Sequence, residues 1–352
     1  MKVLLLSTDS QIFNEASQVR ARILEYGKLF EELHVIVYTK PGYKEKIIGN
    51  VHLWPTNNKF RVGYQRAVFG YVRKNCKKGS DWTVSSQDPF EAGWVGYKLK
   101  SFLGAHFQIQ IHTDFLSPFF AKESWRHRTR VLLAKWLVKK ADRIRVVSER
   151  IKKSLIALDA DLERKIVVLP IFVDREVFHL AISESREINV VGPDDVLVLT
   201  VARKGPEKNI DLANSIIGEL KSRGNKVKWL HIGYKASDKE PEWLVQFIEN
   251  PKSIASFYKM ADLFLLTSNY EGYGMAAVEA AAAGVPVVMT DVGVALGATF
   301  PVGDKERAVA IIEELIQSPE KRRQLVEKQN EFFKNWPTKE QYLEQFKKSL
   351  TF

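Results

Sequence analysis

The sequence predicts an α/β protein built from two doubly wound domains. Short runs rich in valine, leucine and isoleucine alternate with longer amphipathic stretches along the chain, as expected of parallel strands joined by covering helices. A polar interval at 181–195 separates two such series. The chain has 352 residues, 45% hydrophobic and 27% charged, which is ordinary for a globular protein and enough to bury two cores.

The first series predicts seven strands and five helices. We expect strands at Val3–Ser7, Val35–Thr39, Val51–Trp54, Trp82–Ser85, Phe107–Ile111, Ile144–Val147 and Ile166–Leu169, and helices at Glu15–Leu33, Arg61–Lys74, Phe90–Phe102, Trp125–Ala141 and Glu149–Leu158. The opening run MKVLLLSTD is too short for a signal peptide or membrane span, so it reads as the first strand. A single cysteine, Cys76, excludes an internal disulfide and fits a reducing compartment, so we expect a cytoplasmic protein.

The second series predicts four strands flanked by helices. The strands are expected at Val196–Ala202, Val227–Gly233, Leu263–Thr267 and Val285–Thr290, and further helices at Ile210–Arg223, Glu320–Lys334 and Thr338–Leu350. The predicted domains are therefore 1–178 and 179–335, followed by a closing helical segment at 336–352.

The stretch from Ser268 to Gly284 carries the strongest functional signal. It joins an apolar strand to an alanine-rich helix through Gly272, Tyr273 and Gly274, with Glu271 before the turn and Glu279 inside the helix. A helix start favours anions such as phosphate, because its backbone N–H groups are exposed. Helical rise would separate the two carboxylates by roughly 12 Å, about the span from a hexose to the ribose of a nucleotide sugar. A buried helix–sheet junction with two incidental glutamates is the structural alternative.

Arg203 and Lys208 form a second cluster upstream. They follow the strand predicted at Val196–Ala202, at the end where open α/β sheets bind ligands. Two cations beside an anion-binding turn suggest a clamp for a diphosphate.

These residues resemble, in order and spacing, the donor-binding half of family 4 retaining glycosyltransferases with the GT-B fold. The match runs from about 196 to 304 and comprises Arg203, Lys208, Asp262–Ser268, Glu271–Gly274, Glu279, Ala280 and Gly284–Val288, with weaker echoes at His112, Val146–Ser148 and Leu169–Asp174. The resemblance implies two Rossmann-like domains facing a central cleft, the first binding the acceptor and the second the nucleotide sugar. It also implies that the closing helix crosses back onto the first domain.

The resemblance further implies a role for each residue. Glu271 and His112 would contact the donor sugar, and the backbone of Gly272, Tyr273 and Gly274 would approach the sugar and phosphate. Glu279 would accept hydrogen bonds from the ribose hydroxyls. Arg203 and Lys208 would stabilise the departing nucleoside diphosphate. We thus assign Glu271, Arg203, Lys208 and His112 to catalysis and Gly272, Tyr273, Gly274 and Glu279 to donor binding, although a histidine at a strand end is also a common structural hydrogen-bonding group.

No metal or cofactor is expected. Asp159 and Asp161 have the Asp-x-Asp spacing that holds a metal diphosphate in another glycosyltransferase fold, but here the pair follows a helix rather than a strand, which favours a solvated loop. Retention by front-face attack is implied only by the family. The loop after Asp291 lacks the family's usual second glycine and nearby acid, so its contacts cannot be transferred.

Positive charge is concentrated in the first half of the chain. Residues 1–176 contain 31 lysines and arginines against 18 acids, and the remainder contains 22 against 24. Much of the excess lies at 60–78 and 125–140, where basic residues alternate with Trp, Phe and Leu. Such helices suit an anionic membrane surface, or pack on the sheet with their charges solvated. Nucleic acid is disfavoured because no recognition motif accompanies the charge.

The overall prediction is a hexosyltransferase that uses a UDP- or GDP-sugar. The basic helices favour a lipid or lipid-linked acceptor of the cell envelope and a peripheral position at the inner face of the plasma membrane, but a soluble glycan or small metabolite stays open. Other chemistry on the same fold, such as a sugar-nucleotide epimerase or a phosphorylase, is one alternative. A non-catalytic protein that binds sugar nucleotides or a membrane surface is the other.

Overall fold

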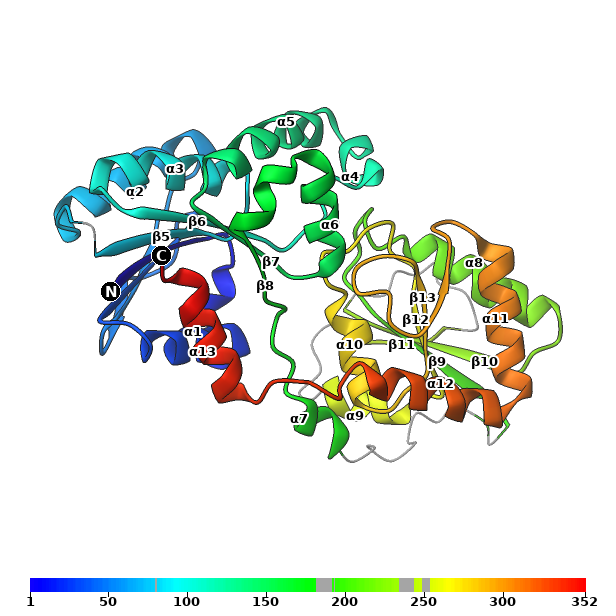
Figure 1. The fold of residues 1–352 in the computed structure, drawn as a ribbon. Coiled ribbons are helices and arrows are strands. Elements are labelled where there is room, and N and C mark those ends of the chain that lie inside the picture. The colour runs from blue at the N-terminus through cyan, green and yellow to red at the C-terminus, as the bar shows by residue number, and fades with distance from the viewer. Residues whose placement is uncertain (80, 182–191, 193, 234–243, 249–253) are drawn as a thin grey trace. The chain divides into compact units, whose positions relative to one another are not determined.

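The computed structural model describes residues 1–79, 81–181, 192, 194–233, 244–248 and 254–352, which form two compact units (Figure 1). The first unit contains 1–116, 124–170 and 338–352, and the second contains 117–123 and 171–337. Apart from the short segment 117–123, the chain passes between units at 170/171 and 337/338, where the sequence suggested 178/179 and 335/336. The polar interval at 181–195 lies mostly outside the described residues.

The first unit is built on a sheet of eight strands in the order β3-β4-β2-β1-β5-β6-β7-β8. The strands are β1 (Lys2–Ser7), β2 (Glu32–Val37), β3 (Lys46–Ile48), β4 (Val51–Pro55), β5 (Trp82–Ser86), β6 (His106–Ile111), β7 (Arg143–Val146) and β8 (Ile166–Val168). All neighbours pair in parallel except β3, a short edge strand that runs antiparallel to β4 and that the sequence analysis missed.

Helices cover this sheet at the places the apolar periodicity indicated. They are α1 (Gln18–Gly27), α2 (Arg61–Asn75), α3 (Glu91–Leu103), α5 (Trp125–Lys140), α6 (Glu149–Leu158) and α13 (Lys339–Leu350), with 3-10 turns η1 (Ser10–Phe13) and η2 (Ala160–Lys165).

The helix expected at Glu15–Leu33 is much shorter than predicted. It ends at Gly27, and the next residues turn into β2. A Cβ at Gly27 would lie 2.2 Å from a Val51 methyl, so this turn of helix rests directly on β4. The Asn50 side chain donates to the carbonyls of Gly27 and Phe30 at 2.9 and 2.8 Å, which satisfies backbone oxygens that the helix end leaves free.

The last helix, α13, packs within the first unit although it is the last element of the chain. The Phe346 ring stacks on Tyr26 of α1 with centroids 3.9 Å apart, and the Tyr342 and Tyr26 hydroxyls are 3.2 Å apart. The Thr83 hydroxyl of β5 donates to the Leu350 carbonyl at 3.2 Å. A capping box at Thr338 fixes where the helix begins.

The second unit has a fully parallel sheet in the order β11-β10-β9-β12-β13-β14. Its strands are β9 (Val196–Val201), β10 (Val227–Ile232), β11 (Leu244–Ile248), β12 (Leu263–Leu266), β13 (Val287–Thr290) and β14 (Ala298–Phe300). Its helices are α4 (Pro118–Lys122), α7 (Arg175–His179), α8 (Ile210–Ser222), α9 (Ile254–Met260), α10 (Met275–Ala282), α11 (Lys305–Gln317) and α12 (Pro319–Glu331). The sequence analysis missed β11, β14, α4 and α7.

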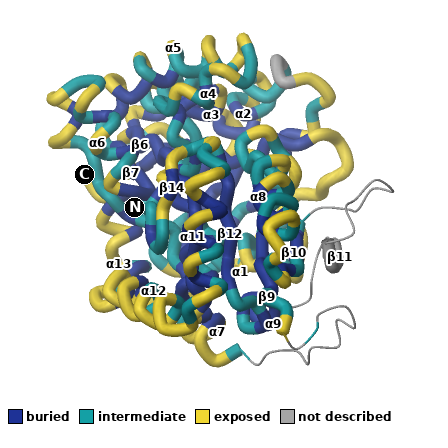
Figure 2. Tube along the Cα trace, turned by 90° about the vertical axis from the view of Figure 1, so that its right-hand side faces the viewer, coloured by how far each residue is buried: buried dark blue, intermediate teal, exposed yellow. Residues whose placement is uncertain are grey.

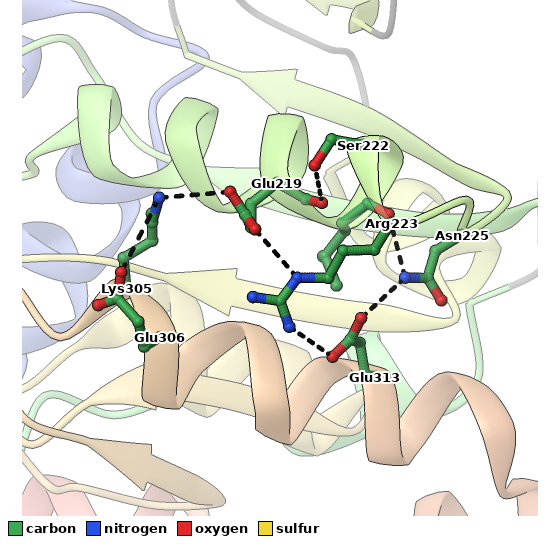
Figure 3. A network of polar contacts seen from close by, with 8 residues as sticks. Glu219, Ser222, Arg223, Asn225, Lys305, Glu306 and Glu313 are labelled. Carbon is green, nitrogen blue, oxygen red and sulfur yellow. Dashed lines mark hydrogen bonds and ion pairs between the residues drawn. The ribbon is translucent and has the colours of Figure 1, made fainter.

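Burial in the second unit follows the layers. In Figure 2 β12 is buried along its length, whereas α12 is mostly exposed. Helices α8 and α11 share one apolar core with the sheet, which includes Ile216, Trp229 and Ile312. At its edge Arg223 joins the two helices by ion pairs to Glu219 at 3.0 Å and Glu313 at 3.1 Å (Figure 3). These helices therefore cover the sheet together and share one core with it.

Within the described ranges, every helix falls short of the length and apolar character that crossing a bilayer requires.

Candidate functional site

The two clusters found in the sequence of the second unit are neighbours in the structure. Strands β9 and β12 are adjacent, so the loops at their carboxyl ends meet. The Thr267 hydroxyl donates to the carbonyls of Lys208 and Asn209 at 3.1 and 3.0 Å, and the Asn269 N–H donates to the Glu207 carbonyl at 2.8 Å. The two loops therefore form a single cross-linked surface at the edge of the sheet.

Lys208 and Glu271 form the charged centre of this surface. The Lys208 Nζ lies 2.5 Å from the Glu271 Oε1, and the Ser268 hydroxyl donates to the same oxygen at 2.7 Å. Both charged side chains are largely buried, with exposed fractions of 21% and 13%. Burial strengthens the pairing because fewer water molecules compete for the charges. Sequence reasoning singled out the two charges but missed Ser268.

Arg203 is placed differently from Lys208. Its side chain is 72% exposed and its Nη2 lies 2.5 Å from the Glu207 carboxylate, four residues further on. The two cations predicted to act together thus have separate carboxylate partners: Lys208 is held against Glu271, and Arg203 extends into solvent beside Glu207.

The turn before α10 is not helical, which corrects the spacing expected between Glu271 and Glu279. Helix α10 begins only at Met275, after Gly274 with a φ of 90°, so the estimate of roughly 12 Å from continuous helical rise does not hold for the first half of the interval. The positive φ favours glycine at this position.

Gly293 in the loop after β13 supports the turn from outside. A Cβ at Gly293 would lie 2.5 Å from the Tyr273 carbonyl oxygen, and the Val294 N–H donates to that same oxygen at 3.0 Å. The loop that departs from the family pattern therefore holds the Gly272–Gly274 turn in place.

Glu279 lies on α10, and among the residues that the structure describes its side chain is hydrogen-bonded to Tyr258 of α9. The fully buried Tyr258 hydroxyl donates to the Glu279 Oε2 at 2.8 Å. Burial raises the pKa of Glu279 to about 7, and the hydrogen bond from Tyr258 opposes part of that rise. Tyr258 could not be recognised from the sequence, because a tyrosine in a short apolar helix looks like any core residue.

His112 follows β6 in the first unit, as expected. It is part-buried, and its Nε2 lies 3.2 Å from the Gln110 Oε1. Burial and the positive charges of Arg145 and Arg22 lower the pKa of His112 to about 3. The imidazole is therefore neutral at ordinary pH, which suits a hydrogen bond to a sugar hydroxyl better than an ion pair with phosphate.

Asp159 and Asp161 serve a structural purpose in the first unit. Asp159 caps the start of η2: its side chain accepts a hydrogen bond from the Asp161 N–H at 3.1 Å, and it forms an ion pair with Lys139 at 2.9 Å. Among all residues with described positions, no three His, Cys, Asp or Glu side chains are grouped so that they could hold a metal ion.

Two family profiles match the chain in its two halves. Residues 181–332 match "Glycosyl transferases group 1" and residues 27–177 match "Glycosyltransferase Family 4". The chain is also 27% identical over 274 residues to an uncharacterized glycosyltransferase of Methanocaldococcus jannaschii, an alignment that covers 74% of this chain and 71% of that relative.

Solved structures show the same fold over the whole length. Sucrose-phosphate synthase from Thermosynechococcus elongatus superimposes with a TM-score of 0.75 at 15% identity, covering 99% of this chain and 98% of the other. Anabaena HepE in complex with UDP and glucose gives 0.74 at 16% identity, covering 100% and 99%.

Proposed function

This chain belongs to the group 1 and family 4 glycosyltransferases with the GT-B fold, and from that premise we propose that it moves a hexosyl group from a nucleoside-diphosphate sugar to an acceptor hydroxyl with retention of configuration. The observation that carries the proposal is the Lys208–Glu271 pair, held by Ser268 beside the start of α10. It sets a cation and a hydroxyl-binding carboxylate next to backbone N–H groups that favour phosphate. A solved relative contains UDP and glucose, which supports a UDP-sugar, and GDP-sugars stay in the proposal.

In this proposal the second unit binds the donor. The ribose hydroxyls donate to Glu279, the backbone of Gly272–Gly274 approaches the phosphate and sugar, and Glu271 accepts from sugar hydroxyls. Lys208 and Arg203 stabilise the charge that develops on the departing diphosphate, with Arg203 exchanging Glu207 for a phosphate oxygen. The first unit would bind the acceptor, and its residue His112 would contact the donor sugar.

Two cations and a helix start would make a metal ion dispensable for this leaving group. We therefore expect transfer to continue at an unchanged rate after exhaustive treatment with a chelator. A loss of activity that Mg²⁺ or Mn²⁺ restores would contradict this part of the proposal.

The donor is best identified by thermal shift with UDP-, GDP- and ADP-sugars. A donor at 100 times its dissociation constant should stabilise the protein by about 2.7 kcal/mol. We expect one nucleotide series to respond and Glu279→Ala to abolish the response. A response that survives Glu279→Ala would contradict the ribose assignment.

The alternatives give different products. A retaining transferase yields a product whose anomeric configuration, measured by NMR, equals that of the donor. A phosphorylase would require free phosphate. A protein that only binds sugar nucleotides would show neither transfer nor hydrolysis, and Glu271→Ala would leave its biological role intact.

We also propose that α5 contacts an anionic membrane surface, where a lipid or lipid-linked acceptor for envelope polysaccharide would be found. Trp125, Leu132 and Trp136 are exposed on this helix by 70%, 69% and 41%, and Phe60, just before α2, is exposed by 74%. Large exposed apolar groups among lysines and arginines are typical of helices that lie in a lipid interface.

Liposome sedimentation tests the membrane proposal. The protein should sediment with anionic vesicles and much less with neutral ones, and replacing Trp125 and Leu132 by serine should weaken binding. Phe332→Ser is the matched control, because Phe332 is also exposed but lies at the end of α12 in the second unit. Equal partitioning between the two vesicle types would remove the proposal.

A further inference from the structure

A row of polar side chains lies inside the first unit, on the face of its sheet that α13 covers. Gln108 and Gln110 of β6 point to the same face, because successive residues of a strand alternate, and His112 just after the strand contacts Gln110. Gln108, Gln110 and Arg145 of β7 are at most 3% exposed. Buried amides and a buried guanidinium are costly unless their polar atoms are paired, so the direction of each hydrogen bond in the row is constrained.

One end of the row is fixed by a backbone carbonyl of α13. The Gln108 Nε2 lies 2.5 Å from the Ser349 carbonyl oxygen, which can only accept, so the amide nitrogen of Gln108 must point there. The Gln108 Oε1 then accepts the only hydroxyl proton of Ser85 at 2.9 Å. With that proton committed, the Ser85 Oγ accepts from the Gln110 Nε2 at 2.9 Å. The Gln110 Oε1 therefore points toward β7.

The other end is fixed independently by Arg145. Its Nη1 lies 2.9 Å from the Gln110 Oε1, and a guanidinium can only donate. Both ends thus require the same orientation of the Gln110 amide. The Gln110 Oε1 is an acceptor, so the His112 Nε2 at 3.2 Å from it must carry a proton.

Arg145 is itself held firmly. Its Nε donates to the Leu169 carbonyl at 3.1 Å, and its Nη2 donates to the Pro170 carbonyl and the Tyr342 hydroxyl, both at 3.0 Å. Burial lowers the pKa of His112 to about 3, and the positive charge of Arg145 adds to this effect, so the ring does not take a second proton near neutral pH. In a neutral imidazole with a proton on Nε2, Nδ1 carries the lone pair.

We propose that Gln110, oriented by Arg145 and by α13, is a positioning residue that holds His112 in its Nε2–H tautomer, so that Nδ1 accepts a hydrogen bond from a hydroxyl of the donor sugar. A phosphate oxygen does not suit this position, because it and Nδ1 are both acceptors. The hydroxyl contact rests on the proposed function, whereas the tautomer is a property of the first unit alone.

Proton–nitrogen correlation NMR on protein with isotope-labelled histidine tests the tautomer directly. The signal of His112 is assigned by its loss in His112→Asn. In the wild-type protein it should show a proton on Nε2 only and no protonation of Nδ1 near neutral pH. A proton on Nδ1, or titration in the neutral range, overturns the proposal whether or not any variant folds.

Variants then separate positioning from mere stability. Gln110→Glu keeps an acceptor for both Arg145 and His112 and should retain the tautomer, whereas Gln110→Leu removes the acceptor and should give a mixture of tautomers with kcat/KM lowered about tenfold or more. Thr83→Val is the matched control: it also removes a buried hydrogen bond between the sheet and α13 but does not touch Gln110. Equal effects of Thr83→Val and Gln110→Leu on the tautomer would overturn the assignment of Gln110.

Ligands test the sugar contact separately from the tautomer. UDP-glucose and GDP-mannose are each compared with the free nucleotide, and only a sugar-bearing ligand should shift the Nδ1 signal. If neither sugar nucleotide shifts it more than its free nucleotide while the Nε2–H tautomer is present, the contact with the donor sugar is overturned. If the tautomer is wrong while a sugar nucleotide binds and reacts, the proposed function stands and the positioning role does not.

Discussion

The first and second units hold their candidate site residues by opposite means. In the second unit Glu271 is held by the positive charge of Lys208 and by a hydrogen bond from the Ser268 hydroxyl, both from neighbouring loops. In the first unit His112 is fixed by a buried row of uncharged amides that ends on a guanidinium and on the last helix of the chain. A short motif can supply the first arrangement, whereas the second needs elements that are far apart in the sequence.

In both units burial favours the neutral form of a candidate site residue. It raises the pKa of Glu279 to about 7 and lowers the pKa of His112 to about 3, because it disfavours the charged form of each group. At neutral pH His112 is fixed as neutral, whereas Glu279 is divided between its two forms. Donor binding should therefore respond to pH through Glu279 and not through His112.

Within the first unit, the largest effect on stability should come from removing the contact between α13 and α1. Phe346 is 3% exposed and stacks on Tyr26, so Phe346→Ala should lower the free energy of unfolding of the first unit by about 3–5 kcal/mol, measured by urea denaturation. Phe332→Ala is the control, since Phe332 is 37% exposed in the second unit and should cost far less. Similar losses in the two variants would mean that α13 is not part of the first core.

Lys208→Ala should cause a large catalytic loss. Removing a cation that stabilises the leaving diphosphate should lower kcat by about 10²–10³-fold. Arg203→Ala should fall in the same range, because a bound diphosphate competes with Glu207 for the guanidinium. Lys226→Ala removes an exposed cation paired with Asp194 and should leave the rate unchanged. A wild-type rate for Arg203→Ala would exclude Arg203 from the clamp.

Gly293→Ala and its control Gly303→Ala test whether Gly293 is needed to support the Gly272–Gly274 turn. Gly303 lies in the same unit, and an added Cβ there would meet no other atom within 4 Å. Both glycines have positive φ, so each alanine should cost about 1–2 kcal/mol of conformational energy. Only at Gly293 would the new methyl overlap the Tyr273 carbonyl, and we expect donor affinity, measured by calorimetry, to fall roughly tenfold there alone. Unchanged affinity in Gly293→Ala would show that the turn does not need this support.

Donor affinity should fall as the pH drops below about 7, the pKa of Glu279. Because the pKa of Glu279 in the folded protein is raised above its usual value, its carboxylate becomes protonated as the pH falls below about 7 and no longer accepts both ribose hydroxyls. The fraction of ionised Glu279, and donor affinity with it, should then fall about tenfold for each further pH unit. Glu279→Gln should bind weakly with no such pH dependence. Tyr258→Phe removes the hydrogen bond that lowers the pKa, so its midpoint should move upward. Calorimetric titrations across the range check all three, and a flat profile for the wild type would contradict the assignment.

Much of the second-unit site could be predicted from the sequence. Glu271, Lys208 and the Gly-x-Gly turn lie at strand ends of a doubly wound sheet, and adjacent parallel strands bring such loops together. The helical spacing to Glu279 failed because a glycine at positive φ delays the start of α10. Most of the segment 233–254, where backbone contacts would decide which nucleotide base is preferred, lies outside the described residues.

The first-unit site could be predicted only at His112. Gln108, Gln110 and Arg145 read as polar interruptions of two apolar strands, and nothing in their order shows that they meet Ser349 and Tyr342 more than 190 residues further on. The early end of α1 was missed for a similar reason: the contacts at that end come from Asn50 and Val51, more than 20 residues further along the chain.

The sequence alone determined the alternation of strands and helices, the two sheets and the charged residues at the strand ends of the second, because periodicity and strand-end position are local properties. Tertiary structure decided which charges pair, that Arg203 extends outward while Lys208 turns inward, and which atom of His112 carries its proton. Those outcomes depend on burial and on the direction of hydrogen bonds between elements distant in the chain, and both exist only once the sheet and its covering helices have formed.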